Sequence, residues 1–511
     1  MKSHRITDTF MALILFFSLI MAAVVAVPQY MIVLLALNFC TGLFLSAFHI
    51  ASAFLPRSVL GQRKLSKEPP VAVLVPAYNE PPAILMQTLE KLSQLSYANY
   101  EVFVIDNNTK DEEVWKPVEA FVHDLGDKFH FFHEDHLAGF KAGALNVLLR
   151  KIPSETEYVA VIDADYLVRP DFLSTALEYF VNRDIALVQF PQHYRNTNKE
   201  SRPISDEYRH FFGIYMNMSN NLNCVPSTGT MSVYRFEALR KIGGFRGESL
   251  TEDADAGLRI YGAGYRGVFV NRPMGYGLMP YDLESYRKQK WRWAFGNAQS
   301  LKTLAVLFGT IPLRSWIGFS SHLTAWHHFH FFSFAALAAV PLLLLSSDPL
   351  SADHRNVFLF ASLSLLVTIV SRLILFFMTF YGQKEAVSRT MQAFAVHMGM
   401  TLIYSEAWIA CFFRVKSGFE RTNKFILHQK PSLLKNTRNE LFLGLWFLFG
   451  VSVSLLRDEP AMSVTFLLAA TALFCIFYVY RKIFPIKLYS RKFLETIEKK
   501  YLPYLEGRNL L

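Results

Sequence analysis

The feature that most constrains the fold of this chain is a set of long apolar runs on both sides of a stretch of ordinary soluble composition. Hydrophobic residues make up 52% of the 511 residues and charged residues only 18%, and the runs hold few of the charges. A helix needs about 20 apolar residues to cross a bilayer core. We therefore predict two transmembrane helices before the central stretch and four after it, at Met11–Val27, Met31–Leu55, Ile317–Leu345, Val357–Phe380, Leu441–Leu456 and Met462–Tyr480.

The first run has a competing interpretation as a secretory signal peptide. Lys2 and Arg5 would be its basic start and Ala23–Ala26 its cleavage region. The second apolar run follows at once, which favours a pair of transmembrane helices.

A fifth segment, Val387–Phe413, is only partly apolar and carries charged residues such as Arg389 and Glu406. The loop that follows it and the C-terminal tail are both strongly basic, which is typical of cytosolic segments. Only an even number of helices places both on the same side as the central stretch. We therefore predict that Val387–Phe413 is an amphipathic helix at the interface, that six helices span an inner or plasma membrane, and that both termini are cytosolic.

Between about Pro69 and Gly296 the chain has a different character. Short β-rich runs such as Val71–Val75, Val102–Ile105 and Tyr158–Ile162 alternate with helical stretches. This alternation predicts βαβ units and a mostly parallel sheet. The expected division is two helices in 1–68, a cytosolic α/β domain in 69–300, a membrane domain in 301–482 and a basic tail in 483–511.

Charge and cysteine content exclude several classes of protein. The net charge of +10 is compatible with nucleic acid or an anionic membrane face, and the basic residues beside the apolar runs favour the membrane. The sequence therefore predicts no nucleic-acid partner. Four scattered cysteines without a CxxC pair support neither a disulfide framework nor a zinc site.

The strongest chemical signal follows the strand at Tyr158–Ile162. That apolar strand leads directly into Asp163 and Asp165, two carboxylates separated by one residue. Like charges so close repel each other unless a cation lies between them. Hard oxygen ligands indicate Mg²⁺ or Mn²⁺, shared with a diphosphate. A chance Asp-x-Asp is the alternative.

Two other strands end in polar groups at the same predicted edge. Tyr78 and Glu80 follow the first strand, where such sheets bind nucleotides, although a simple turn is an alternative. Asp106 follows the second strand and could receive a base or ribose, or could cap the next helix. Lys141 lies near a helix start between glycines, where it could neutralise a phosphate or simply be solvated.

Two further motifs come later in the central stretch. Glu252 and Asp253 follow Thr251, and this carboxylate cluster could supply a general base. A plain helix N-cap at Thr251 is the alternative. The run from Gln289 to Trp293 offers an Arg fork for phosphate oxygens and a Trp face for a sugar ring. Its alternative is an aromatic and basic belt at the membrane surface.

In order and spacing, these elements resemble the membrane-embedded processive glycosyltransferases of family 2. This group includes bacterial cellulose synthase catalytic subunits, curdlan-type β-glucan synthases and hyaluronan synthases. The resemblance covers roughly Pro69 to Lys424. It implies a nucleotide-sugar-binding α/β domain of the glycosyltransferase A type, with a mixed, mostly parallel sheet, inserted in an α-helical transmembrane domain of about six helices.

The resemblance also implies a role for each motif. Asp253 would be the catalytic base, with Glu252 beside it, and Asp163 and Asp165 would hold Mg²⁺ or Mn²⁺. The acceptor sugar would be bound by Trp293, Thr228 and Gly229. The UDP-sugar would be bound by Tyr78, Glu80, Asp106, Lys141, Asp163, Gln289 and Arg292.

A later segment resembles the FxVTxK gating loop of cellulose synthases. It spans Phe419–Lys424, within an expected gating-like loop at 416–428. Thr422 and Lys424 match the pattern and would contact the UDP-sugar. Arg421 replaces the valine of the pattern.

The resemblance implies a processive, inverting transferase that polymerises a β-glucan from UDP-glucose and exports it. Its partners would be the growing glycan, the lipid bilayer and possible export or accessory subunits. Asn107–Thr109 replaces the Asp-Gly of cellulose synthases after Asp106, and Ile105–Pro117 is more similar to synthases of other bacterial β-glucans. This similarity favours a β-1,3 over a β-1,4 linkage. Only 481–511 follows the last predicted helix, so we expect no cyclic-di-GMP-binding barrel.

Two rival functions stay open. A non-processive transferase that adds one sugar to a lipid acceptor would share the acidic motifs. A transporter or channel with a large cytosolic regulatory domain would share the six helices, but the ordered acidic and basic motifs disfavour it. Arg372, inside an apolar run, could line a path for the polymer or extend to the cytosolic interface.

Overall fold

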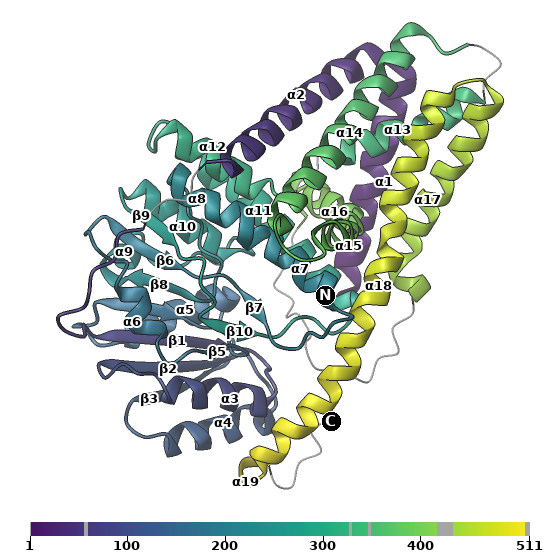
Figure 1. Ribbon diagram of the computed structural model, residues 1–511. Coiled ribbons are helices and arrows are strands. Elements are labelled where there is room, and N and C mark those ends of the chain that lie inside the picture. The colour runs from purple at the N-terminus through teal and green to yellow at the C-terminus, as the bar shows by residue number, and fades with distance from the viewer. Residues whose placement is uncertain (1, 56–59, 327–329, 346–348, 416–432, 506–511) are drawn as a thin grey trace.

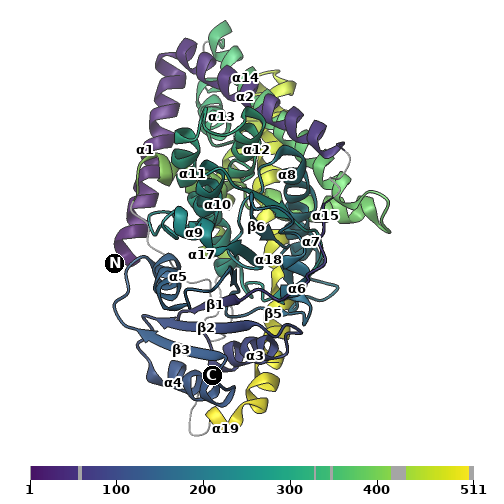
Figure 2. The same ribbon diagram turned by 90° about the vertical axis from the view of Figure 1, so that its left-hand side faces the viewer.

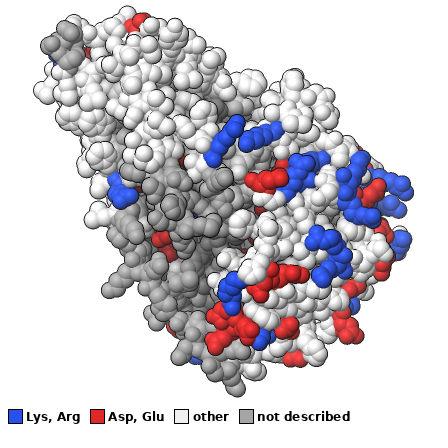
Figure 3. Space-filling view, turned by 180° about the vertical axis from the view of Figure 1, so that it is seen from behind, with Lys and Arg blue, Asp and Glu red and all other residues white. Residues whose placement is uncertain are grey.

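The computed structural model describes residues 2–55, 60–326, 330–345, 349–415 and 433–505. They form an α/β domain with a tall bundle of helices beside it (Figure 1). Charged side chains gather over the α/β domain, whereas the far end of the bundle carries few of them (Figure 3). This distribution agrees with the predicted combination of a soluble-type domain and a membrane domain.

The α/β domain is built on a seven-stranded mixed sheet in the order β3-β2-β1-β4-β8-β6-β9. Four of its strand pairs are parallel, and only β8 runs antiparallel to its neighbours. The predicted mostly parallel sheet is therefore confirmed, as are the three strands predicted from the sequence. The strands are β1 (Val71–Ala77), β2 (Tyr100–Asn107), β3 (Phe129–Glu134), β4 (Tyr158–Val161), β6 (Ile185–Gln189), β8 (Ser232–Arg235) and β9 (Arg266–Phe269).

Helices cover both faces of this sheet, because the strands are apolar on both sides. Val73 and Val75 of β1 face one buried cluster, whereas Ala72 and Leu74 face the other. The first face is covered by α3 (Pro82–Ser93), α4 (Glu112–Asp124) and α6 (Phe172–Leu177), and the second by α5 (Phe140–Lys151), α9 (Phe236–Lys241) and α10 (Glu252–Gly262).

A small second sheet lies near the carboxyl ends of the main strands. Its order is β5-β10-β7, from β5 (Leu167–Val168), β7 (His193–Tyr194) and β10 (Gly275–Gly277). The domain then continues into helices that pack against the bundle. These are α7 (Arg202–His210), the π-helix η1 (Phe211–Met216), α8 (Asn217–Leu222), α11 (Leu283–Val306) and α12 (Leu313–Leu323).

Four described helices have the length and apolar character to cross a membrane. They are Pro28–Ala53, Ala352–Phe380, Asn436–Leu456 and Pro460–Ile483. Two shorter apolar helices are also described, Met11–Ala26 and Phe332–Leu344. The count of six spanning helices and the domain boundaries therefore stay predictions. The bundle helices are α1 (Lys2–Ala26), α2 (Pro28–Ala53), α13 (His330–Leu344), α14 (Ala352–Phe380), α17 (Leu433–Leu456) and α18 (Pro460–Lys500).

Two predicted segments are broken in the structure. The expected run Ile317–Leu345 is divided between α12 and α13. The expected single helix Val387–Phe413 is two helices, α15 (Ala386–Met398) and α16 (Thr401–Phe412), and both bury many side chains. The second break falls at Gly399, where α18 passes so close that a Cβ would lie 2.9 Å from the Cys475 carbonyl oxygen.

The C-terminal segment, expected only as a basic tail, continues α18 to Lys500 and ends in α19 (Leu502–Leu505). Figure 2 shows that it reaches the outer side of the α/β domain, beside α3 and α4. Tyr501 is buried there, and the Lys500 ammonium lies 2.6 Å from the Glu90 carboxylate. The last helix of the bundle is thus fixed to the α/β domain.

Candidate active site

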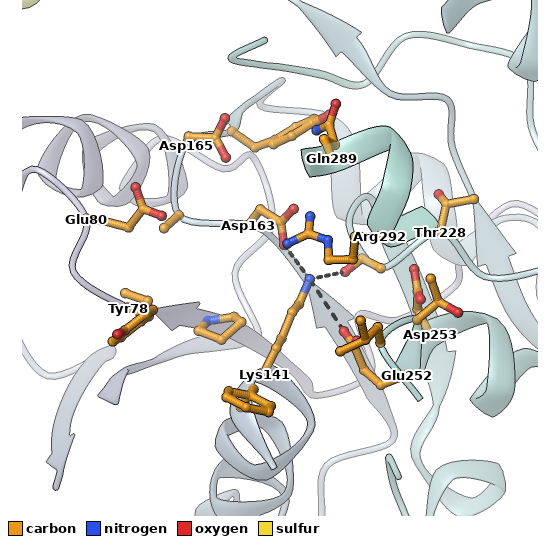
Figure 4. A pocket seen from close by; sticks show the side chains of 18 of the residues that line it. Tyr78, Glu80, Lys141, Asp163, Asp165, Thr228, Glu252, Asp253, Gln289 and Arg292 are labelled. Atoms are coloured by element: carbon orange, nitrogen blue, oxygen red, sulfur yellow. Dashed lines mark hydrogen bonds and ion pairs between the residues drawn. The ribbon is translucent and has the colours of Figure 1, made fainter. Parts of the chain in front are cut away.

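A cavity of ≈ 380 Å³ opens at the carboxyl edge of the central strands. It brings together residues that are separated by more than 200 positions in the chain (Figure 4). The cavity walls include twelve of the predicted site residues: Tyr78, Glu80, Lys141, Asp163, Asp165, Thr228, Gly229, Glu252, Asp253, Gln289, Arg292 and Trp293.

The ammonium of Lys141 lies at the centre of the cavity. It is 2.5 Å from the Asp163 carboxylate and 4.0 Å from Glu252 Oε1, and it donates a hydrogen bond of 3.1 Å to the Gly229 carbonyl. Burial alone would lower the pKa of Lys141, but the carboxylates of Asp163 and Glu252 outweigh burial and raise it. Lys141 therefore stays charged at neutral pH and offers its charge to an anionic ligand.

The position of Lys141 follows from the local backbone. Helix α5 begins at Phe140, after Gly139 in the left-handed region with φ of 84°. Glycine adopts that conformation without steric cost, so the chain can turn sharply from the preceding loop into the helix. The turn brings the first helical residues to the sheet edge, as the glycine-flanked motif predicts.

Glu252 and Asp253 open α10, with Thr251 as the N-cap residue. The Thr251 side chain makes no capping hydrogen bond, so a plain N-cap does not account for this motif. Burial, and then the Asp253 carboxylate, raise the pKa of Glu252 to about 7. Burial also raises the pKa of Asp253, although Lys141 opposes it. The pair therefore takes up a proton near neutral pH, which suits a general base.

Gly229 borders Asp253 so closely that no side chain would fit. A Cβ there would lie 2.6 Å from Asp253 Oδ2 and 3.4 Å from Lys141 Nζ, and φ is +81°. Its neighbour Thr228 holds the loop in place, because the Thr228 carbonyl accepts a hydrogen bond of 2.8 Å from Gln192. The loop therefore brings backbone groups directly to the carboxylate.

The two aspartates after β4 have different surroundings. The Asp163 side chain is 34% exposed and faces the cavity, with Lys141 against Oδ1. Asp165 is buried, and its Oδ2 accepts a hydrogen bond of 2.7 Å from the Leu278 N–H. Among the described residues no group of three His, Cys, Asp or Glu side chains could hold a metal. Two hard oxygen donors fit Mg²⁺ or Mn²⁺ only if a bound diphosphate supplies further ligands.

Asp106 is buried and is not among the residues that line the cavity. It is 2% exposed, its Oδ2 accepts a hydrogen bond of 2.9 Å from Thr109, and Oδ1 lies 3.3 Å from His133. Burial raises the pKa of Asp106 to about 6, against the effects of Thr109 and His133. The alternative role as a helix cap is filled by Asp111. Because Thr109 also bonds the Asn79 N–H, Asp106 supports the turn that presents Tyr78.

Helix α11 forms the wall toward the bundle. Gln289, Arg292 and Trp293 lie within about one turn of it and line the cavity, and Arg292 points toward Asp163 (Figure 4). The Tyr208 hydroxyl bonds the Gln289 side chain. A belt at the membrane surface therefore does not account for Gln289 and Arg292.

The cavity and the predicted site residues do not coincide completely. Thr422 and Lys424 lie outside the described residues, so the gating-like loop at 416–428 stays a prediction. Sequence reasoning did not assign several polar and aromatic lining residues that lie at or after strand ends or in very short strands, where no periodic pattern marks them. They include Asn107, Asn108, Gln192 and Tyr194.

Comparison with known proteins finds a family match for the central segment. Residues 69–296 match the family described as "Glycosyltransferase like family 2". The cellulose synthase catalytic subunit of Xanthomonas axonopodis pv. citri is 29% identical over 241 residues, which cover 45% of this chain and 32% of that protein. A probable glucomannan 4-beta-mannosyltransferase of Arabidopsis thaliana is 28% identical over 253 residues, covering 47% and 45%. The matches thus span less than half of either relative.

Among solved structures, a mannosyltransferase from Pyrobaculum calidifontis in complex with GDP-Man and Mn²⁺ has a similar fold. The TM-score is 0.53 at 19% sequence identity, and the match covers 76% of this chain and 99% of that one. This likeness supports the glycosyltransferase A type of fold.

Proposed function

Since residues 69–296 form a family 2 glycosyltransferase domain of the cellulose synthase type, we propose that the protein is a processive β-glycan synthase. The donor is a UDP-sugar, and the acceptor is the non-reducing end of the growing glycan. More specifically, we propose UDP-glucose as donor and a β-glucan as product, with β-1,3 favoured over β-1,4. The catalytic domain is cytosolic, at the inner or plasma membrane.

One observation carries this proposal. A partly buried ammonium, that of Lys141, lies between Asp163 and Glu252, with Asp253 beside it, in a cavity at the carboxyl edge of the sheet. Positive charge for a diphosphate and a carboxylate of raised pKa are thereby placed within a few ångströms of each other. A sugar transfer needs both groups at one point.

In the proposed reaction, Asp253 removes the proton from the attacking hydroxyl of the acceptor. The new bond forms between that oxygen and C1 of the donor sugar, the bond from C1 to the diphosphate breaks, and UDP leaves with inversion. Lys141 and Arg292 stabilise the negative charge on the departing diphosphate. Mg²⁺ or Mn²⁺ on Asp163 and Asp165 would supply further positive charge when bound.

A run of aromatic rings supports export through the bundle. The Trp293 ring lies 5.7 Å from that of Trp326, Trp326 stacks on Phe211 at 4.9 Å, and Phe211 stacks on Tyr215 at 6.0 Å. The run ends at the Arg372 guanidinium, 5.5 Å from the Tyr215 ring. Arg372 is only 6% exposed, so it lies in the interior of the protein. Flat rings and an interior cation suit a path for a sugar chain.

Reconstituted vesicles test the proposed function. UDP-glucose is added outside proteoliposomes that contain the purified protein, and the product is digested with linkage-specific glucanases before and after detergent. We expect a long glucan that β-1,3-glucanase cleaves only after detergent has opened the vesicles. A single hexose on an extractable lipid would contradict the proposal and favour the non-processive transferase.

A further inference from the structure

A fully buried ion pair lies behind the wall that α11 contributes to the cavity. The Lys290 ammonium is 2.5 Å from Glu207 Oε2, and the two side chains are only 1% and 3% exposed. Lys290 follows Gln289 directly in the chain, but it points away from the cavity and toward α7. No local pattern in the sequence pairs it with a residue 83 positions earlier.

Glu207 connects three helices. Besides Lys290, its Oε2 accepts a hydrogen bond of 3.1 Å from the Tyr286 hydroxyl of α11. Its Oε1 lies 3.2 Å from Nδ1 of His397 on α15. One carboxylate on α7 therefore holds two turns of α11 and one position of α15 in a fixed relation.

The Lys290 ammonium also contacts aromatic rings at the predicted acceptor site. It lies 4.0 Å from the centre of the Tyr208 ring and 4.9 Å from that of the Trp293 ring. Tyr208 in turn meets Trp293 edge-on at 5.6 Å and bonds Gln289. A cation within about 6 Å of a ring attracts it, so the position of Trp293 depends on the ammonium behind it.

Stability alone does not explain this pair. Removing two charges from water is costly, and replacement of a buried pair by apolar residues of similar volume is often neutral or stabilising. Apolar side chains at positions 207 and 290 would therefore be expected to stabilise the packing of α7 against α11 at least as well. What a buried polar network with satisfied hydrogen bonds adds is rigidity and a specific packing of its partners.

We propose that the Lys290–Glu207 pair is a positioning device that sets Trp293 against the acceptor sugar, and that His397 links this setting to α15. The proposal rests on the proposed glycosyl transfer. Neither charge touches the donor cavity, so both are positioning residues rather than catalytic ones. Loss of the pair should misplace the acceptor while the donor still binds.

The test compares transfer with hydrolysis of the donor. Water can attack the bound UDP-sugar without an ordered acceptor, so the ratio of sugar in polymer to free sugar reports acceptor placement. In Lys290→Met we expect this ratio to fall at least tenfold, while UDP affinity stays within about twofold of the wild type. Where Lys290→Met does not fold, the double variant Lys290→Met/Glu207→Leu removes both charges, and we expect the same fall.

A matched control exists at the neighbouring position of α7. Arg389 of α15 forms a buried two-point pair with Asp206 of α7, at 2.9 and 2.5 Å. Its other contacts are Gln383 and the Phe380 ring, none of which lies on α11. In Arg389→Met we expect a lower melting temperature but an unchanged ratio. An unchanged ratio in the Lys290 variants, or an equal fall of the ratio in Arg389→Met, would overturn the inference. Absence of any sugar transfer by the wild-type protein would instead overturn the proposed function.

Discussion

Replacement of Lys141 by Met removes the ammonium that lies 2.5 Å from the Asp163 carboxylate, a positive charge that also acts on Glu252 and Asp253. The ammonium lies 4.0 Å from Glu252 Oε1. At that distance, with an effective dielectric constant of about 20, the attraction is about 4 kcal/mol. Since 1.36 kcal/mol corresponds to one pKa unit, the pKa of Glu252 should rise by up to about 3 units from its value of about 7.

The same ammonium holds down the pKa of Asp253, so the proposed base should also become harder to ionise. A base must be deprotonated to act, so the rate falls as the pH drops below its pKa. In Lys141→Met this fall should begin at a higher pH. At pH 7.5 we expect a loss of about 10²–10³ in rate, since a charge contact to the departing diphosphate is lost as well.

The assay is UDP release from the UDP-sugar between pH 6 and pH 9.5, with Lys141→Arg as the variant that keeps the charge. The deficit of Lys141→Met should shrink toward high pH, and Lys141→Arg should follow the wild-type profile more closely. The reasoning is refuted if Lys141→Met keeps a third of the wild-type rate, or if its deficit is the same at every pH.

Three further predictions address other parts of the molecule. Asp253→Asn should lose about 10²–10⁴ in transfer yet bind UDP within a few-fold, as calorimetry can check; near-normal turnover would exclude Asp253 as the base. Tyr501→Ala removes a buried ring, so it should destabilise the α/β domain by about 3 kcal/mol and expose the C-terminal segment to protease. Lys500→Ala removes only one partner of an exposed ion pair, so it should cost about 1 kcal/mol or less. Equal losses of stability in the two variants would contradict this account of the packing. Burial raises the pKa of Glu406 from 4.5 to about 7. The protonated Glu406 side chain should therefore stabilise the fold at low pH, and this stabilisation should be lost as the pH rises from about 4.5 to about 7. The melting temperature of Glu406→Gln should not show this decrease with pH.

The sequence was most informative where one local pattern determines position. The strand that ends at Val161 predicts that Asp163 lies at the sheet edge, because parallel strands deliver their carboxyl ends to one place. The glycines around Lys141 likewise predict a sharp entry into a helix. For such residues, secondary structure and site follow from the same few positions.

Contacts between distant segments could not be predicted in this way. Nothing in the spacing of α7 indicates that Glu207 meets Lys290, since the pair forms only when the two helices pack. Asp106 lies near the end of its strand as expected, but its side chain is buried, accepts a hydrogen bond from Thr109 and does not line the cavity. The break at Gly399 depends on the close passage of α18, which hydropathy does not register.

The most direct test of the proposed function is UDP release by the purified protein in nanodiscs, with Mg²⁺ or Mn²⁺ and each of four donors. These are UDP-glucose, UDP-N-acetylglucosamine, UDP-galactose and UDP-glucuronate, and the product of each reaction is sized. We predict that UDP-glucose gives metal-dependent release and a product of high molecular weight. Absence of UDP release with all four donors would contradict the proposed synthase, and release that yields only a single transferred sugar would contradict its processivity.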